Sequence, residues 1–128
     1  MGAVTIVEGD ALELDQQYSA GSFDYVHAGL FLHHLNEDHI VRVLTSMNRI
    51  ARRGIIWNDL VRSRIGYAFI WLFTIGQPEI VRHDARVSVK AGFTKPEAMN
   101  LARAAGISYA DHRWNLFTHR FTVAGEKK

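Results

Sequence analysis

The amino-acid sequence predicts an α/β domain whose parallel sheet is closed by a carboxyl-terminal antiparallel hairpin. Three observations lead to this prediction. Short β-branched segments alternate with segments of helical spacing, and two strand-like segments end the chain. About fifteen residues separate the first two predicted strands, which is enough for a parallel crossover. Because such crossovers are right-handed, we expect helices on both faces of the sheet.

The amino-terminal half reads as strand, crossover, strand and helix. Residues 3–7 are mostly β-branched and end in a turn, and residues 23–28 repeat that pattern after Gly21. From Asn36 onward, apolar residues recur at intervals of three and four, with acidic residues first and arginines last before Gly54. This arrangement is typical of a helix capped by asparagine and ended by glycine.

The next part of the chain predicts a third strand and a hydrophobic insert. Residues 54–60 form an apolar run that ends in polar residues. Residues 60–93 are rich in aromatic and aliphatic side chains, and we expect a helix or a helical pair followed by a loop.

The last third of the chain predicts a helix and the closing hairpin. Thr94 and Glu97 have the spacing of a capping box, and Gly106 is placed to end the helix. Residues 107–114 and 118–127 then read as two strands joined by a turn.

Composition predicts one domain spanning residues 1–128, with a hydrophobic insert at about 60–93. The chain has 128 residues, 48% of them hydrophobic, which is enough for one core. The formal net charge of +2 is too weak to indicate a nucleic-acid partner. The longest apolar run, residues 65–76, is shorter than the ~20 residues that cross a bilayer, so we expect no membrane partner.

Cysteine is absent from the sequence. This absence excludes disulfides, thiolate metal ligands and a cysteine nucleophile, and it fits a reducing cytoplasm as the location.

With its elements in this order, the chain resembles the later portion of class I S-adenosylmethionine-dependent methyltransferases of the small-molecule type. The resemblance implies a Rossmann-like sheet, S-adenosylmethionine as cofactor and a small molecule as substrate. Five blocks in family order carry it: "VEGDALEL" (7–14), "FDYVHAGLFLHHL" (23–35), "RIARRGIIWNDL" (49–60), "GFTKPEAMNLARAAGI" (92–107) and "FTVAGEKK" (121–128).

The sequence departs from the family at its start. In the family, two further strands and a Gly-rich turn come first, whereas no G-x-G-x-x-G occurs here. We therefore expect a methyltransferase sheet truncated at the N-terminus. The two missing strands lie, in the family sheet, between residues 3–7 and residues 23–28. Either these two strands pair directly, or the edge of the second binds a second copy of the chain, giving a homodimer.

Two groups of residues are candidates for cofactor binding. The resemblance implies that Asp10 accepts a hydrogen bond from the adenine amino group, with Ala11 beside the ring. A turn residue bound to nearby backbone is the alternative for Asp10. Ala28, Gly29 and Leu30 end the second strand, where parallel sheets border their ligand crevice. The alternative is that they only terminate the strand.

The histidines are candidates for a catalytic base. Adjacent His33 and His34 point in different directions, so we expect no metal to be bound by both. His34 is one candidate base, with packing or lining of the crevice as the alternative. His83 in the insert is the preferred candidate, because methyl transfer to a protonated nucleophile needs a base. The alternative is a loop histidine paired with Asp84.

Substrate contacts are predicted at the end of the third strand and in the insert, from Asp59, Arg62 and Asp84. The aromatic run at 67–73 is predicted to belong to the core or to cover an apolar substrate, with a membrane-surface helix as the alternative. Oxygen, nitrogen and carbon acceptors all remain open. A different class of function also remains open, namely a non-catalytic module that binds a partner or itself through an exposed sheet.

Overall fold

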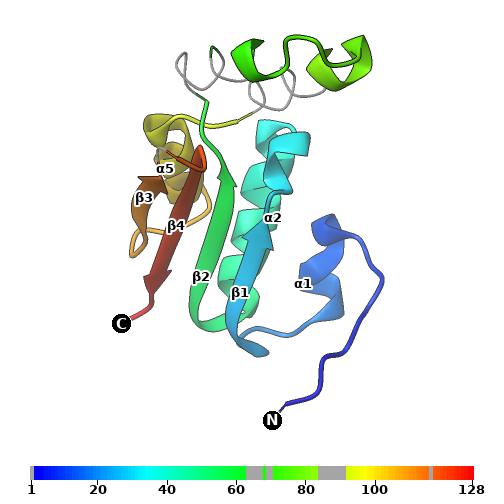
Figure 1. Cartoon of the computed structure of the whole chain (residues 1–128). Helices are drawn as coiled ribbons and strands as arrows, with labels where there is room; N and C mark the ends of the chain where they lie inside the picture. The colour runs from blue at the N-terminus through cyan, green and yellow to red at the C-terminus, as the bar shows by residue number, and fades with distance from the viewer. Residues whose placement is uncertain (1, 63–67, 69–70, 84–91, 116) are drawn as a thin grey trace.

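The computed structural model describes residues 2–62, 68, 71–83, 92–115 and 117–128 and has a mixed α/β fold (Figure 1). One sheet has the order β1-β2-β4-β3, with β1 and β2 parallel and the other two pairs antiparallel. The parallel pair and the closing hairpin predicted from the sequence are confirmed. The strands are β1 (Phe23–Gly29), β2 (Ala51–Leu60), β3 (Asp111–Asn115) and β4 (Arg120–Glu126).

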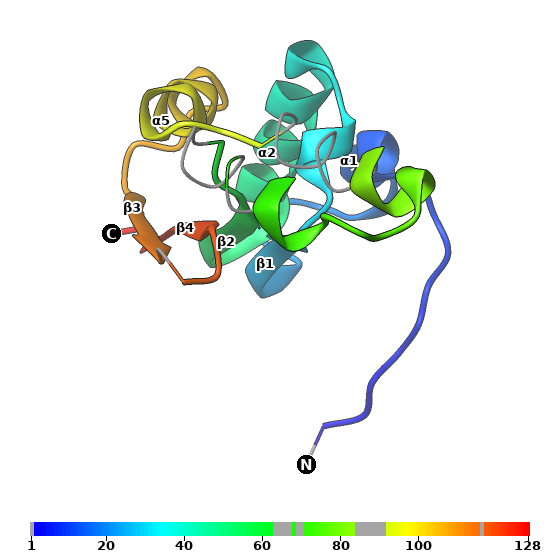
Figure 2. The ribbon, with the colours of Figure 1, turned by 45° about the horizontal axis from the view of Figure 1, so that its top comes forward.

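The main helices cover one face of the sheet (Figures 1 and 2). The expectation of helices on both faces is therefore wrong for the described part of the chain. The opposite face exposes side chains such as Tyr25, which is 42% exposed. The helical elements are η1 (Ala11–Glu13), α1 (Leu14–Gln17), η2 (Leu32–His34), α2 (Glu37–Ile50) and α5 (Lys95–Ala104), and residues 71–73 and 79–83 are also helical.

The core lies between the sheet and these helices, and three aromatic rings mark its centre. Trp57 of β2 contacts Phe93 and Phe121 edge to face, each with ring centroids 5.1 Å apart. Phe93 and Phe121 meet at 6.0 Å in the same manner. Edge-to-face packing adds to the hydrophobic gain of burying large rings. The rings therefore join β2, β4 and the segment before α5.

Helix α2 begins as predicted and ends earlier than predicted. The Asn36 side chain accepts a hydrogen bond from the backbone N–H of His39 at 2.9 Å. The helix stops at Ile50, and β2 starts at the next residue, so the arginines at 52 and 53 belong to the strand. A lysine takes over the capping role that glycine was expected to have. The ammonium group of Lys127 donates to the carbonyl oxygens of Asn48 and Ala51 at 2.5 and 2.6 Å.

Helix α5 forms half of its predicted capping box. The Thr94 hydroxyl accepts from the backbone N–H of Glu97 at 3.4 Å, as expected. The Glu97 carboxylate, however, pairs with Arg62 instead of returning to Thr94. Gly106 has φ +83°, so it ends the helix in the left-handed conformation that glycine adopts readily.

Two glycines allow close approaches of backbone to β4, from β2 and from the segment before β3. A Cβ atom on Gly54 would lie 2.1 Å from the carbonyl oxygen of Gly125, and one on Gly125 would lie 2.4 Å from that of Tyr109. No side chain can replace the hydrogen at either position without moving backbone. Gly54 therefore packs within β2 instead of ending α2.

Residues 2–10 form no strand, which corrects the prediction of a strand over residues 3–7 (Figure 1). Val4 and Ile6 are 91% and 94% exposed. Their β-branched character favours a strand only where a neighbouring backbone supplies hydrogen bonds, and no described strand lies beside them. The expected direct pairing with residues 23–28 is likewise wrong. Within the described residues, β2 is the sole strand neighbour of β1.

No helix found among the described residues has the length and apolar character needed to cross a membrane.

Candidate functional site

The candidate site lies where the parallel strands β1 and β2 end. The carboxyl ends of parallel strands meet at one edge of a sheet, where ligand crevices form. Just beyond β1, Leu30 adopts φ +53° and donates its backbone N–H to the carbonyl oxygen of Asn58 at 2.8 Å. A left-handed backbone is uncommon for a leucine, and such strain concentrates at functional sites.

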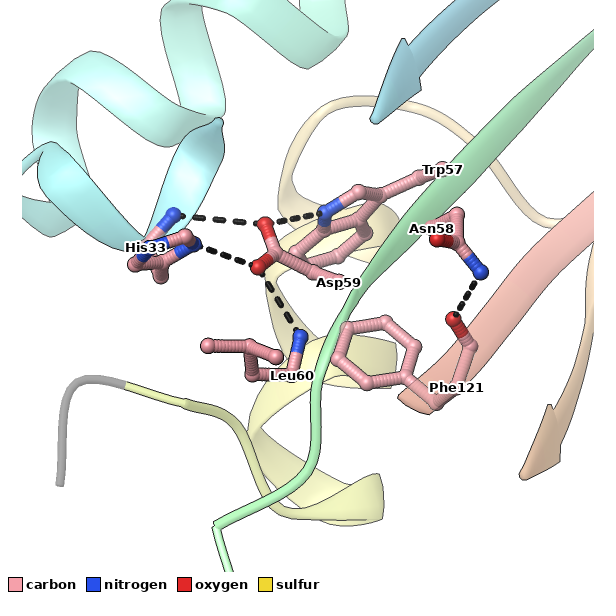
Figure 3. A network of polar contacts seen from close by, with 6 residues as sticks. All are labelled: His33, Trp57, Asn58, Asp59, Leu60 and Phe121. Atoms are coloured by element: carbon pink, nitrogen blue, oxygen red, sulfur yellow. Dashed lines mark hydrogen bonds and ion pairs between the residues drawn. The ribbon is translucent and has the colours of Figure 1, made fainter. Parts of the chain in front are cut away.

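A histidine and an aspartate meet at this edge (Figure 3). The Nδ1 atom of His33, in η2, lies 2.6 Å from Oδ1 of Asp59, near the end of β2. The two side chains are 6% and 0% exposed. The loop that follows β1 therefore places an imidazole against a fully buried carboxylate.

Four donors satisfy that carboxylate. Besides the His33 ring, the backbone N–H of His33 and the indole N–H of Trp57 donate to Oδ2, each at 3.3 Å. The backbone N–H of Leu60 donates to Oδ1 at 2.9 Å. A carboxylate removed from water is tolerated only when hydrogen bonds replace its hydration. Asp59 is therefore held rigidly, and it holds His33 in turn.

This geometry selects one tautomer of the His33 ring. Because Asp59 accepts, Nδ1 carries the hydrogen and Nε2 keeps its lone pair. Within the part of the chain that the structure describes, no hydrogen bond to Nε2 is formed. The free nitrogen can therefore accept a proton from a bound molecule.

The two predicted base candidates, His34 and His83, have no carboxylate partner among the described residues. The exposed ring of His34 lies against His33, with centroids 4.0 Å apart, and pairs with no carboxylate of the described residues. His83 is exposed at the end of the helical stretch 79–83. Its predicted partner, Asp84, lies outside the described residues.

The residues expected to contact substrate are differently placed. Asp59 has no exposed surface, and its carboxylate contacts the ring of His33. Arg62 pairs with the carboxylate of Glu97 at the surface.

A pocket of about 490 Å³ lies on the other side of the η2 loop. It brings the two predicted adenine-binding residues, Asp10 and Ala11, next to Phe31, which sequence reasoning did not single out. The Asp10 carboxylate also accepts from the backbone N–H of Leu12 at 2.9 Å, so it acts as a turn residue as well. The pocket is lined by Glu8, Gly9, Asp10, Ala11, Leu12, Phe31 and Leu35.

Ala28, Gly29 and Leu30 end β1 next to the η2 loop, and the pocket lining does not include them. Among the described residues, no group of three histidine, aspartate or glutamate side chains could hold a metal ion.

Comparison with known proteins shows which fold this chain shares. Residues 1–56 match the family model described as a methyltransferase domain. A SAM-dependent methyltransferase from Thermotoga maritima superimposes with a TM-score of 0.63 at 18% identity, covering 98% of this chain and 65% of that one. The fold is that of a class I methyltransferase. No curated protein matches the sequence.

Two further solved structures share the methyltransferase-like fold. PigF, solved with SAH, gives a TM-score of 0.61 at 20% identity and covers 95% of this chain and 39% of PigF. A candidate O-methyltransferase of Nostoc punctiforme gives 0.64 at 18% identity, covering 94% and 36% of the two chains. The chain thus spans less than half the length of these two structures.

In this methyltransferase-like fold, sequence reasoning missed the link between His33 and Asp59. A usable signal was present: a buried strand ends in an aspartate, and a histidine closely follows the strand predicted to lie parallel to it. Parallel strand ends meet at one edge, so the two side chains could have been paired. The tautomer of His33 could be assigned only from the structure.

Proposed function

We propose that this chain forms part of an S-adenosylmethionine-dependent methyltransferase for a small molecule, with His33 as the base and Asp59 as its orienting partner. The buried contact between these two residues is the observation that carries the proposal. The absence of cysteine supports the cytoplasm as the location.

The pocket beside η2 fits the adenosine part of the cofactor. Its lining offers one aromatic ring, Phe31, and short apolar side chains, as planar ligands prefer. Asp10 uses one carboxylate oxygen on Leu12, and its other oxygen is available to accept from an amino group. We infer that Asp10, Ala11 and Phe31 hold the adenine, with Gly29 and Leu30 bordering the methionine part.

When bound, S-adenosylmethionine supplies an electrophilic methyl group. The protein must then align the acceptor and remove its proton as the new bond forms. Nε2 of His33 takes that proton, and the carboxylate of Asp59 stabilises the resulting imidazolium. General-base assistance of this kind typically accelerates a reaction by roughly 10²–10⁴-fold.

The insert at 60–93 supplies the cover over the acceptor in this proposal. Trp71, Leu72 and Phe73 are 47%, 57% and 73% exposed, which is unusual for three consecutive large apolar side chains. An apolar or aromatic acceptor would bury such side chains. His83, on the same insert, remains a second candidate base.

The role of His33 can be tested without knowing the acceptor. Long-range ¹H–¹⁵N NMR spectra of the imidazole rings report which nitrogen carries the hydrogen. We expect His33 to be the Nδ1–H tautomer, and Asp59→Asn to remove this preference. The exposed His34 serves as an internal control in the same spectra. An Nε2–H tautomer at His33 would contradict its role as a base.

Cofactor binding can be tested by calorimetric titration of S-adenosylhomocysteine into the chain. We expect binding, and we expect Phe31→Ala to weaken it by about tenfold or more, because an aromatic contact is lost. Phe117→Ala is the matched control, since that ring is 95% exposed on the distant hairpin. No heat at millimolar ligand would exclude cofactor binding by this chain.

Self-association is the second candidate function, and the free edge of β1 favours it. Among the described residues no strand pairs with that edge, and the exposed residues 3–7 offer β-branched side chains suited to a strand. We propose a homodimer in which residues 3–7 of each copy pair with β1 of the other. Light scattering should then show a dimer that Ile6→Lys converts to a monomer. A monomeric wild-type chain would rule this out.

A further inference from the structure

A second pocket, of about 380 Å³, lies on the sheet face away from the helices. Asn58 and Asp59 are adjacent on β2, so their side chains point to opposite faces of the sheet (Figure 3). The His33 site and this pocket are therefore separated by the thickness of the sheet. The lining residues are Asn58, Arg113, Trp114, Asn115, Thr118, Arg120 and Thr122.

Strand register brings two arginines together on this face. Arg113 of β3 lies opposite Thr122 of β4, and Asn115 lies opposite Arg120. Arg113 and Arg120 are thus diagonal neighbours on one face, where Cα atoms are typically ~7–8 Å apart. Two guanidinium groups that share one face as diagonal neighbours repel each other, and an anion between them relieves the repulsion.

Neither arginine is neutralised by a residue that the structure describes. Within the described ranges, Arg113 and Arg120 form no ion pair and no side-chain hydrogen bond, whereas four other arginines do form ion pairs: Arg52, Arg53, Arg62 and Arg82. Asp111 shares the strand and the face with Arg113 but forms no ion pair with it. The pocket therefore holds two cationic groups without a counter-charge from the described residues.

The neutral groups of the pocket are arranged to donate. The Asn58 amide donates to the Thr122 hydroxyl oxygen and to the carbonyl oxygen of Phe121, each at 3.1 Å. The Thr122 hydroxyl hydrogen is therefore left to donate elsewhere.

At the hairpin turn, the side-chain oxygen Oδ1 of Asn115 accepts from the backbone N–H groups of Phe117 and Thr118 at 2.8 and 3.3 Å. Its amide hydrogens remain available. The side-chain oxygens of Thr122 and Asn115 thus accept hydrogen bonds within the protein, and their hydroxyl and amide hydrogens remain available to a ligand.

We propose that this pocket binds a phosphate group, held by Arg113 and Arg120 with Thr122 and Asn115 as neutral donors. Guanidinium forks match the oxygens of phosphate, and charge-assisted hydrogen bonds are the stronger kind. Trp114 also lines the pocket, although strand alternation turns its side chain to the face of Phe121, opposite that of Arg113. The site is independent of the proposed methyl transfer.

NMR titration of the ¹⁵N-labelled chain tests this, with inorganic phosphate and phenyl phosphate as probes at constant ionic strength. We expect saturable shifts confined to the backbone amides of residues 113–115, 118, 120 and 122. Tighter binding of phenyl phosphate would identify a phosphate ester as the ligand, and equal affinities would identify free phosphate. Shifts spread evenly over all basic residues, or no shifts, would overturn the proposal.

Variants separate a built site from general attraction by positive charge. Arg113→Gln and Arg120→Gln should each weaken phosphate binding by about tenfold, which corresponds to one charge-assisted contact. Arg42→Gln is the matched control, because it removes the same charge from an exposed position on α2. Equal weakening by all three variants would overturn the proposal. Arg113→Lys, which keeps the charge and loses the fork, should lose less than Arg113→Gln.

Discussion

The imidazole of His33 donates from Nδ1 to the carboxylate of Asp59 across 2.6 Å, although 26 residues separate the two in sequence. Residue 33 follows β1 and residue 59 nearly ends β2, so the contact forms only when these strands pair in parallel. The pair therefore couples the chemistry of the site to the sheet register.

Loss of the Asp59 carboxylate should destabilise the fold. Asp59→Ala leaves buried donors without an acceptor, including the indole N–H of Trp57 and the backbone N–H of Leu60. We expect a loss of about 3 kcal/mol in the free energy of unfolding, measured by urea denaturation. Asp111→Ala is the control, and its exposed carboxylate should cost less than about 0.5 kcal/mol. Equal effects would show that the buried network contributes little.

Lys127 should stabilise the junction between α2 and β2. Its ammonium group binds two carbonyl oxygens where the helix passes directly into the strand, those of Asn48 and Ala51. Lys127→Met keeps most of the apolar stem and should cost about 1–2 kcal/mol in thermal or chemical unfolding. Lys128→Met removes the same charge from an exposed neighbour and should be nearly neutral. If Lys127→Met left the free energy of unfolding unchanged, Lys127 would not stabilise the junction.

Gly54 should tolerate no side chain. A Cβ atom there would meet the carbonyl oxygen of Gly125 at 2.1 Å, so β2 and β4 would have to separate. We expect Gly54→Ala to lower the free energy of unfolding by about 3 kcal/mol or to prevent folding. Gly2→Ala, where no atom lies within 4 Å of the added carbon, should unfold like the wild type. Circular dichroism during urea titration compares the two.

Stability should fall in mild acid through His112. Burial, and secondarily the charge of Lys95, lower the pKa of His112 below its ordinary value, and its ring stacks on Phe121. The folded state thus binds this proton less readily than the unfolded state. The contribution of neutral His112 to the free energy of unfolding is complete above about pH 6.5, the ordinary pKa of histidine. It is lost as the pH falls toward the pKa of His112 in the folded state. Between pH 5 and 8, the free energy of unfolding should depend less steeply on pH for His112→Phe than for the wild type.

Local signals in the sequence predicted the elements whose cause is local. Asn36 and Thr94 begin helices because their side chains accept from backbone three residues later, and that spacing is visible in the sequence. Gly106 ends α5 for an equally local reason, its positive φ.

Features that depend on distant partners were not predicted. Residues 3–7 read as a strand, yet strand formation needs a neighbour that no local pattern reveals. Gly54 was interpreted as a helix terminator because Gly125, the residue that it contacts, is distant in the sequence. The role of His33 was missed for the same reason, since its partner lies on another strand.

The close contact of Gly54 with Gly125 fixes more than local packing. Side chains alternate along β2, so a slip of one residue against β4 would turn Asn58 toward the helices and Asp59 toward the open face. The His33 ring would lose its contact with Asp59, and the second pocket would lose Asn58, at once. Two glycines that line neither pocket thus fix the register of β2 against β4. The sites on the two faces of the sheet therefore form together or not at all.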